Sequence, residues 1–236
     1  GSQDAADDVN GITVAGIGTS GALEGHRDGS TTAIALLSYR GNIVQTGAIN
    51  VESLALANGG SITLTHPSNH VANLAVSQQG EAHNLAFTNN GNVAIARLLR
   101  SGLYDMSGID TDGDVTFNVT GAITTAGGVY GPRIVANRLT MYTTGGIGST
   151  NNALLTTAAQ LSAINTAGGG STAPIHIANV NNSAYTEALV VKQAVQVAGI
   201  GGNRGAVIID NTGGMVIAAA PFPAPPNGVY GVKTTS

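Results

Sequence analysis

Residues 41–76 read GNIVQTGAINVESLALANGGSITLTHPSNHVANLAV, and they hold the pattern on which the rest of the chain is built. Within this stretch, Ile62-Thr63-Leu64 and Asn73-Leu74-Ala75-Val76 alternate large apolar residues with small or polar ones. Alternation at period two predicts short strands with one buried face. Between them lies Asn58-Gly59-Gly60, and glycine and asparagine tolerate the positive φ that sharp corners require. The stretch therefore predicts a strand, a turn and another strand.

The same pattern recurs along the chain on both sides of this stretch. Helical periodicity is poor throughout, and even the best helical candidate, residues 152–164, is rich in threonine and flanked by glycines. We therefore expect strand and turn there too. The further short strands that the alternation predicts are Ile12–Val14, Leu85–Phe87, Val93–Ile95, Val115–Val119, Leu139–Met141, Ile175–Ile177, Val195–Val197 and Val207–Ile209.

Many short strands at intervals of about ten residues are typical of a sandwich, a barrel or a solenoid. Tryptophan is absent and aromatic residues make up 4% of the chain, so the large side chains that fill a wide sandwich core are missing. Residues 41–49 and 113–123 also echo one another, and both reach Gly-Ala-Ile. We predict an all-β fold, a parallel β-helix, with about a dozen coils of about twenty residues, each rising ~4.8 Å.

Charge and composition exclude several classes of partner. Charged residues make up only 9% of the chain and the formal net charge is −4, with no basic patch, so we expect no nucleic-acid partner. The longest apolar runs are too short for a membrane span, so we expect no membrane insertion. The chain has no cysteine, which removes disulfides, thiolate catalysis and Cys-based zinc sites.

We expect three regions along the chain. Residues 1–10 include Gly1-Ser2, which is typical of a cloning tag, and are expected to fray. Residues 11–220 form the β-helix domain. Residues 221–236 begin with Pro221-Phe222-Pro223, and proline cannot donate to a β ladder, so this region is expected to be a linker or an edge-covering tail.

Two segments resemble a known family. The first is residues 41–76, in which the resemblance is carried by GSITLTHPSNHVANLAV. The second is residues 131–169, in which it is carried by ANRLTMYTTGGIGSTNNALLTTAAQL. Both resemble filamentous-haemagglutinin-like exoproteins of Gram-negative bacteria, and the likeness covers roughly residues 41–219. The resemblance implies a right-handed parallel β-helix and export by two-partner secretion with an outer-membrane partner. It also implies adhesion to a glycan or protein of host cells or other bacteria. The family's N-terminal secretion domain is not visible, so the resemblance implies an internal or distal fragment.

One acidic segment is a candidate metal site. Asp110-Thr111-Asp112-Gly113-Asp114 places three carboxylates at alternate positions, and such residues in a tight loop can converge on Ca²⁺. An EF-hand loop would need Gly at its sixth position and Glu at its twelfth, where this chain has Val115 and Gly121. We expect any Ca²⁺ binding to be weak, and the alternative is a solvated Asp-Gly turn between coils.

Other motifs favour structural roles. Residues 16–21 match G-x-G-x-x-G, but Gly25 interrupts the helix that a dinucleotide site requires, so a corner is expected. His66, His70 and His83 either hold a metal or, as we prefer, belong to a polar loop with histidines stacked between coils.

Two further signals bear on sugars. The tyrosines, among them Tyr104, Tyr130 and Tyr142, are either sugar-stacking platforms or caps on coil edges. Asn118-Val119-Thr120 and Asn181-Asn182-Ser183 match the acceptor sequence for N-linked sugar, as expected by chance in a chain this rich in Asn, Ser and Thr.

Three functions are compatible with the sequence. The first is a non-catalytic, secreted adhesin fragment that displays loops on a stiff solenoid. The second is a carbohydrate-active β-helix enzyme, a lyase or hydrolase, which needs paired carboxylates that the 13 acidic residues supply only if stacking brings them together. The third is a threonine-patterned binder of a flat repeating surface such as ice, for which only Thr63 and Thr65 fit the Thr-x-Thr pattern well. We expect the first, with no catalytic residue and no cofactor beyond weak Ca²⁺.

Overall fold

The computed structural model describes residues 11–16, 33–38, 40–78, 80, 83–100, 104–127, 131–166, 173–181, 188–196, 205–218 and 231–235. These residues form strands and connecting turns, with no helix among them. The strands are β1 (Ile12–Val14), β2 (Ala33–Ser38), β3 (Ile43–Gln45), β4 (Asn50–Asn58), β5 (Ile62–Leu64), β6 (His70–Gln78), β7 (Leu85–Asn89), β8 (Val93–Ile95), β9 (Arg97–Arg100), β10 (Tyr104–Ser107), β11 (Ile109–Asp110), β12 (Asp114–Val119), β13 (Ile123–Thr125), β14 (Ile134–Thr143), β15 (Leu154–Asn165), β16 (Ile175–Val180), β17 (Leu189–Gln196), β18 (Val207–Thr212), β19 (Met215–Ile217) and β20 (Gly231–Thr235).

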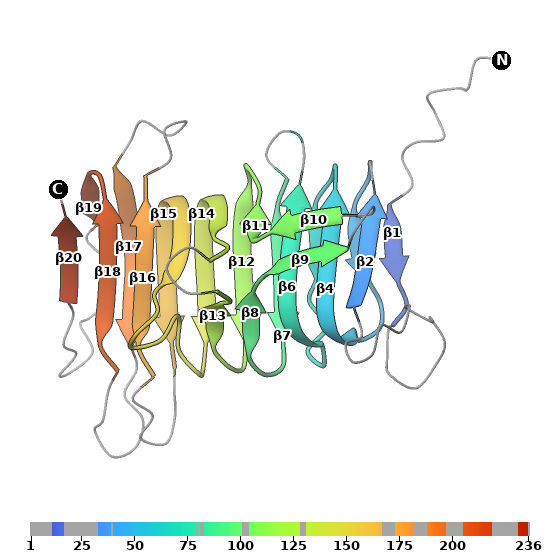
Figure 1. Cartoon of the computed structure of the whole chain (residues 1–236), viewed down its shortest axis with the longest axis horizontal. Helices are drawn as coiled ribbons and strands as arrows, with labels where there is room; N and C mark the ends of the chain where they lie inside the picture. The colour runs from blue at the N-terminus through green and yellow to red at the C-terminus, as the bar shows by residue number, and fades with distance from the viewer. Residues whose placement is uncertain are drawn as a thin grey trace.

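The strands stack as a parallel β-helix, which confirms the expected fold. Eighteen of them belong to one hydrogen-bonded sheet, and the two others, β9 and β10, form a separate antiparallel hairpin. Each strand of the large sheet pairs in parallel with the strand one coil further along the chain, as β3 does with β5 and β4 does with β6. Figure 1 shows these strands side by side along the length of the molecule.

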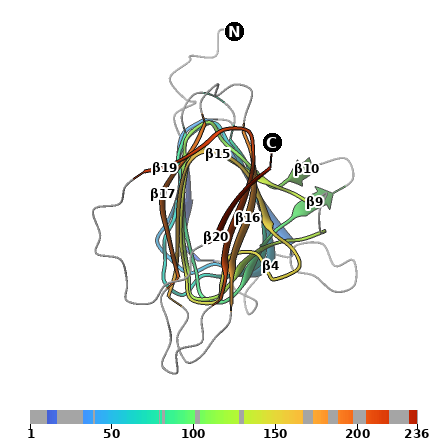
Figure 2. The same ribbon diagram turned by 90° about the vertical axis from the view of Figure 1, so that its left-hand side faces the viewer.

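Two walls face each other across a narrow interior, as Figure 2 shows in a view along the stack. The rear sheet consists of β1, β3, β5, β7, β12, the second halves of β14 and β15, β17 and β19. The front sheet contains β2, β4 and β6, then β8, β11 and β13, the first halves of β14 and β15, and β16, β18 and β20.

The described residues form fewer coils than the predicted dozen, because nine of their strands stack in the rear sheet. Ile43 pairs with Ile62, 19 residues on, as a short coil requires, but Ile12 pairs with Ile43, 31 residues on. The coil between Leu85 and Val115 contains an excursion that leaves the stack and returns to it. This excursion is the β9–β10 hairpin, which departs after β8 and rejoins the front sheet at β11.

The core consists of inward-facing side chains that stack in ranks along each wall. Along the rear sheet, Leu85, Val115 and Leu139 follow one another in register, and each is fully buried. Full burial of such aliphatic side chains stabilises the fold by about 1.5–3 kcal/mol each. Phe87 and Phe117 lie on successive coils and meet edge to face, with ring centroids 6.1 Å apart. A thin core of this kind is why a chain with few aromatic residues folds.

Buried asparagines close the corners between the walls. Asn69 is fully buried, and its side-chain amide donates to the backbone carbonyls of Leu64 (3.2 Å) and Thr88 (3.0 Å). Its side-chain oxygen accepts from the backbone N–H of Ile49 at 2.9 Å. Each such side chain pairs backbone groups that the turn leaves outside the strand ladder, as buried polar groups require. The other buried asparagines are Asn58, Asn89, Asn165, Asn179 and Asn211.

Some corner glycines are required by close approach of neighbouring coils. A Cβ at Gly113 would lie 2.2 Å from the carbonyl oxygen of His83, and one at Gly121 would lie 2.5 Å from the backbone nitrogen of Asn92. Neither has a positive φ, whereas Gly91 and Gly127 do, at 104° and 94°. The turn clusters of the sequence therefore contain glycines for two different physical reasons.

The two longest strands, β14 with 10 residues and β15 with 12, are long because the chain passes from one wall to the other without a break. In β14, Ile134 pairs with Ile109 of the front sheet, whereas Leu139 pairs with Val115 of the rear sheet. The next strand, β15, follows the same course, which confirms extended structure rather than helix over residues 152–164.

At the C-terminal end, residues 231–235 form β20, which pairs in parallel with β18. Residues 1–10 and 219–230 lie outside the described residues. No helix with the length and apolar character of a membrane span occurs in the described part of the chain.

Candidate binding surface

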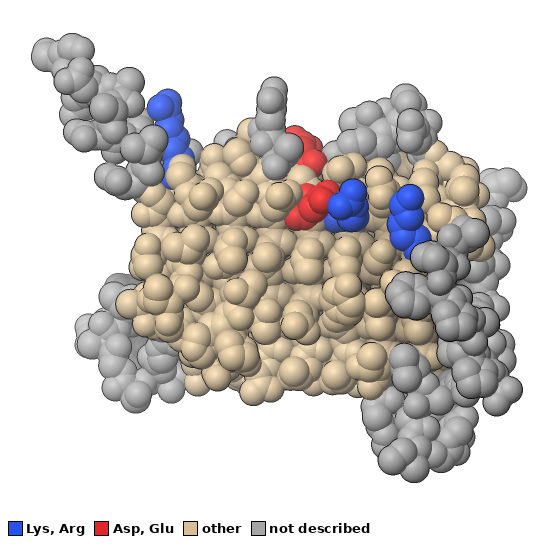
Figure 3. Space-filling view, turned by 180° about the vertical axis from the view of Figure 1, so that it is seen from behind, with Lys and Arg blue, Asp and Glu red and all other residues tan. Residues whose placement is uncertain are grey.

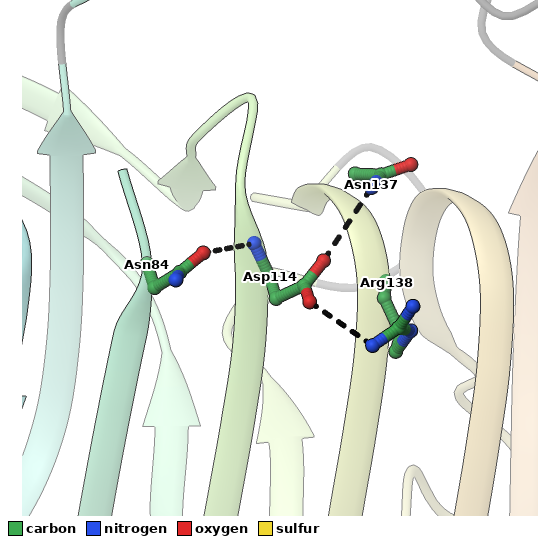
Figure 4. A network of polar contacts seen from close by, with 4 residues as sticks. All are labelled: Asn84, Asp114, Asn137 and Arg138. Carbon is green, nitrogen blue, oxygen red and sulfur yellow. Dashed lines mark hydrogen bonds and ion pairs between the residues drawn. The ribbon is translucent and has the colours of Figure 1, made fainter. Parts of the chain in front are cut away.

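The predicted acidic site lies at the corner that leads into β12. Asp110 ends β11 and Asp112 lies in the following turn, and both are exposed. Asp114 begins β12, where its backbone N–H donates to the side-chain oxygen of Asn84 at 2.9 Å. Its carboxylate lies 3.2 Å from Nη1 of Arg138 and accepts a long hydrogen bond of 3.4 Å from the amide of Asn137. Figure 4 shows Asp114 held between neighbouring coils in this way.

The carboxylates of this segment do not gather into a metal-binding group. Across the described residues, no cluster of three or more His, Asp or Glu side chains is placed to hold a metal ion. One of the three predicted ligands, Asp114, instead has a guanidinium as its partner. Calcium binding by Asp110, Asp112 and Asp114 stays a prediction.

Two of the three loop histidines, His66 and His70, contact the backbone of their own turn or of the next coil through their rings, and His83 accepts at its own backbone carbonyl. Nδ1 of His70 lies 2.6 Å from the carbonyl oxygen of Asn90, and Nδ1 of His66 accepts from the backbone N–H of Ser68 at 3.2 Å. The carbonyl oxygen of His83 accepts from the hydroxyl of Thr111. These are contacts of polar corner residues.

Several sequence motifs fall partly outside the described residues. Of the glycine motif, Gly16 is described and residues 17–21 are not. Tyr130 and the side chain of Tyr104 also lie outside the described part. Of the two sequons, Asn118-Val119-Thr120 lies at the end of β12 with the Asn118 side chain exposed, and the second is described only at Asn181.

The outer surface of the rear sheet carries two ranks of uncharged side chains, which we call the neutral face. Its members alternate with buried residues along β5, β7, β12, β14 and β15, and they stack in register from coil to coil. The first rank is Thr63, Ala86, Thr116, Thr140 and Ser162, and the second is Thr88, Asn118, Tyr142 and Ile164.

Charged side chains border the neutral face and do not enter it. Figure 3 shows the rear of the molecule as a broad uncharged area, with Lys, Arg, Asp and Glu gathered near one margin. Asp114 and Arg138 precede the first rank on β12 and β14, and they pair with each other. The face therefore presents hydroxyl, methyl, amide and aromatic groups, bordered by the Asp114–Arg138 ion pair and, next to Ser162, by the exposed Lys192 of β17.

The front sheet carries a different surface feature. Ala35, Ala55 and Ala75 stack in register on its outer side, and Leu98 and Met106 of the β9–β10 hairpin pack over them. Figure 1 shows the hairpin lying across the strands of this sheet. The small alanine side chains let the hairpin approach the sheet closely. The β9–β10 hairpin is therefore packed against the outer side of the front sheet.

An exposed ion pair holds the two hairpin strands together. Nε of Arg97 donates to one carboxylate oxygen of Asp105 at 2.8 Å, and Nη2 donates to the other. This bidentate hydrogen bonding from Arg97 lowers the pKa of the Asp105 carboxyl and raises the pKa of the guanidinium. Beside the hairpin base lies an open groove of about 440 Å³, lined in part by Asn73, Arg97 and Pro132.

The neutral face and the alanine rank were both missed from the sequence, although their alternation was visible. Thr116 and Thr140 are 24 residues apart, and only the coil register makes them neighbours. Comparison of the chain with family models, with curated proteins and with solved structures found no match.

Proposed function

We propose that the chain is a non-catalytic segment of a secreted bacterial adhesin. In this proposal the β-solenoid is a stiff spacer that displays loops and one broad face for attachment to a surface glycan or protein of host cells or other bacteria.

The observation that carries this proposal is a constant core with coils of variable length. The inward rank of the rear sheet stays in register from Ile12 to Ile217. Over the same stretch, the number of residues between one paired position and the next varies, from 19 between Ile43 and Ile62 to 31 between Ile12 and Ile43. A stack of this type tolerates insertion at its corners, because each coil contacts only its neighbours. Function can therefore vary in the loops and faces while the scaffold is kept.

Repetition along the stack favours attachment through many weak contacts. The neutral face repeats similar side chains on five strands, and a longer solenoid would present more of them. Linking weak sites on one rigid body raises the overall avidity without strengthening any single contact. This suits an adhesin better than an enzyme, which concentrates its chemistry in one place.

The carboxylates with defined partners give less support to the enzymatic alternative. Hydrolysis of a glycosidic bond needs one carboxyl group that stays protonated near neutral pH, which requires a raised pKa. The pKa of Asp105 is lowered by Arg97, and Asp114 lies against Arg138. The hydrogen bonds from Arg97 favour the charged Asp105 carboxylate over the protonated acid.

The proposal is tested by attachment of beads that carry the purified, folded chain at high density. We expect such beads to adhere to cultured host cells or to bacteria more than beads carrying an inert protein at the same density. Soluble monomer should compete poorly, because it lacks avidity. Beads that adhere to none of a panel of host and bacterial cells, while circular dichroism shows intact β structure, would overturn the proposal.

A further inference from the structure

Tyr142 is an exposed aromatic residue in the middle of the neutral face. It lies in the second half of β14 and is 45% exposed. In register, Asn118 lies beside it on the preceding coil and Ile164 on the following one. The sequence left open whether this tyrosine caps a coil edge, and its place within a strand of the rear sheet, with strands on both sides, is not that of a cap.

Hydroxyl groups without partners lie next to this ring. Among the described residues, no hydrogen bond involves the side chains of Thr116, Thr140 or Ser162. These three lie on successive coils, which are spaced about 4.8 Å apart. Thr140 is two residues before Tyr142, so the hydroxyl rank runs about 7 Å from the aromatic one. An aromatic platform therefore lies beside a row of hydrogen-bonding groups.

The two sides of a sugar ring match these two features. The axial C–H groups of a pyranose form an apolar surface that packs on an aromatic ring, while its hydroxyls project from the ring edge. Tyrosine offers a large, rigid contact area at a low cost in conformational entropy. Thr, Ser and Asn side chains both donate and accept hydrogen bonds, as sugar hydroxyls require.

The absence of charge on this face selects among glycans. Sulfated and carboxylated polysaccharides are recognised by cationic side chains, and the nine members of the neutral face include none. Pressing an anionic chain against such a face would strip water from its charges without providing counter-charges. Of the charges that border the face, Asp114 and Arg138 are paired with each other, and the exposed Lys192 of β17 lies at one end of the first rank, beside Ser162. One lysine at the margin does not supply counter-charges along the length of a repeating anionic chain.

We propose that the neutral face binds an extended, uncharged polysaccharide, with one sugar ring stacked on Tyr142 and neighbouring hydroxyls bonded to the rank that contains Thr116, Thr140 and Ser162. This inference rests on the proposed adhesive function and names its ligand class. A flat hydrogen-bonding lattice such as ice is a poorer match, because Ala86 interrupts the first rank and Tyr142 and Ile164 break the repeat of the second.

The test measures binding of the whole chain to insoluble neutral glucan and mannan, and to alginate and heparin beads as anionic probes. We expect saturable binding to at least one neutral polymer that changes little between low and high salt. The Tyr142→Ala variant, which lacks the aromatic ring, should bind that polymer about tenfold more weakly, whereas Tyr142→Phe, which keeps the ring, should retain most of the binding. Leu99→Ala is the matched control, because it truncates an exposed large side chain that lies on the β9–β10 hairpin and not on the neutral face. This variant should bind as the wild type does.

Three results would overturn the inference. They are neutral binding that Tyr142→Ala leaves unchanged, salt-sensitive binding to the anionic beads alone, and inhibition of ice recrystallisation without glycan binding. If protein-coated beads adhere to cells while no neutral polymer is bound, this inference fails and the adhesive function stands. If neither occurs, both fail.

Discussion

Asn89 allows a direct test of how the corners of the stack are held. This fully buried residue ends β7. Its side-chain oxygen accepts from the backbone N–H of Val71 at 2.8 Å, and its amide donates to the carbonyl of the same residue at 3.1 Å. The amide also donates to the carbonyl oxygens of Gly91 and Asn92, at 3.1 and 3.3 Å. One side chain thus pairs four backbone groups on two coils.

Asn89→Ala leaves those groups without their partner. A buried donor or acceptor left unpaired costs about 1–3 kcal/mol, and here both the N–H and the C=O of Val71 lose a bond inside the stack. Water can reach the more exposed corner, so we count these two groups only. The free energy of unfolding should fall by about 3 kcal/mol.

The assay is equilibrium unfolding in urea, followed by circular dichroism, for the wild type, Asn89→Ala and Asn118→Ala. The control, Asn118→Ala, removes an asparagine side chain from the adjacent coil. Asn118 is exposed, and it lies in register with Thr88, the residue before Asn89. We expect the control to stay within about 0.5 kcal/mol of the wild type. If the two variants unfold at the same urea concentration and with the same slope, the buried asparagines do not hold the corners and the reasoning is refuted.

Three further predictions concern the corners and the hairpin. Gly121→Ala should lower the melting temperature markedly, because a Cβ would lie 2.5 Å from the backbone nitrogen of Asn92 on the preceding coil, and a melt identical to that of the wild type would contradict this. Asp105→Asn should leave the melting temperature nearly unchanged but speed proteolysis within residues 97–107, because the exposed pair with Arg97 holds the hairpin strands together. Since the pKa of Asp105 lies below its usual 3.8, this protection should be present at neutral pH and lost as pH falls through the lowered pKa; a variant with unaltered proteolysis would refute it. If Ca²⁺ binds through Asp112, millimolar CaCl₂ should raise the melting temperature of the wild type over EDTA but not that of Asp112→Ala, and an equal rise in both would place the ion elsewhere.

The strands were predictable because side chains alternate across a sheet whatever the tertiary context. Residues 115–119 alternate strictly, and the structure places Val115, Phe117 and Val119 inside and the residues between them outside. The scarcity of large aromatic residues limited the width of the core, which favoured a solenoid over a sandwich. Composition and period two therefore sufficed for the fold class.

The number of coils was not predictable in the same way. The strand Arg97–Arg100 contains apolar residues like those of the core strands, yet it leaves the stack and packs on an outer alanine rank. Nothing in its pattern distinguishes an outward hairpin from another coil. The difference depends on partners more than twenty residues earlier in the chain.

The buried asparagines and the neutral face were missed for a related reason. Asn69 and Asn118 are the same residue type near strand ends, yet one is fully buried in a corner and the other is exposed. The neutral face joins residues from five strands, and its members become neighbours only through the coil register. Local sequence contains neither piece of information.

The most direct test of the central claim, that this chain binds without cleaving, is one incubation with two readouts. The purified chain is mixed with insoluble neutral polysaccharide, and the protein retained and the soluble sugar released are measured together over many hours. We predict saturable retention of protein with no sugar released above the protein-free control. Release that grows in proportion to protein concentration, and that stops when one carboxylate such as Asp114 is replaced by its amide, would contradict the claim and identify an enzyme.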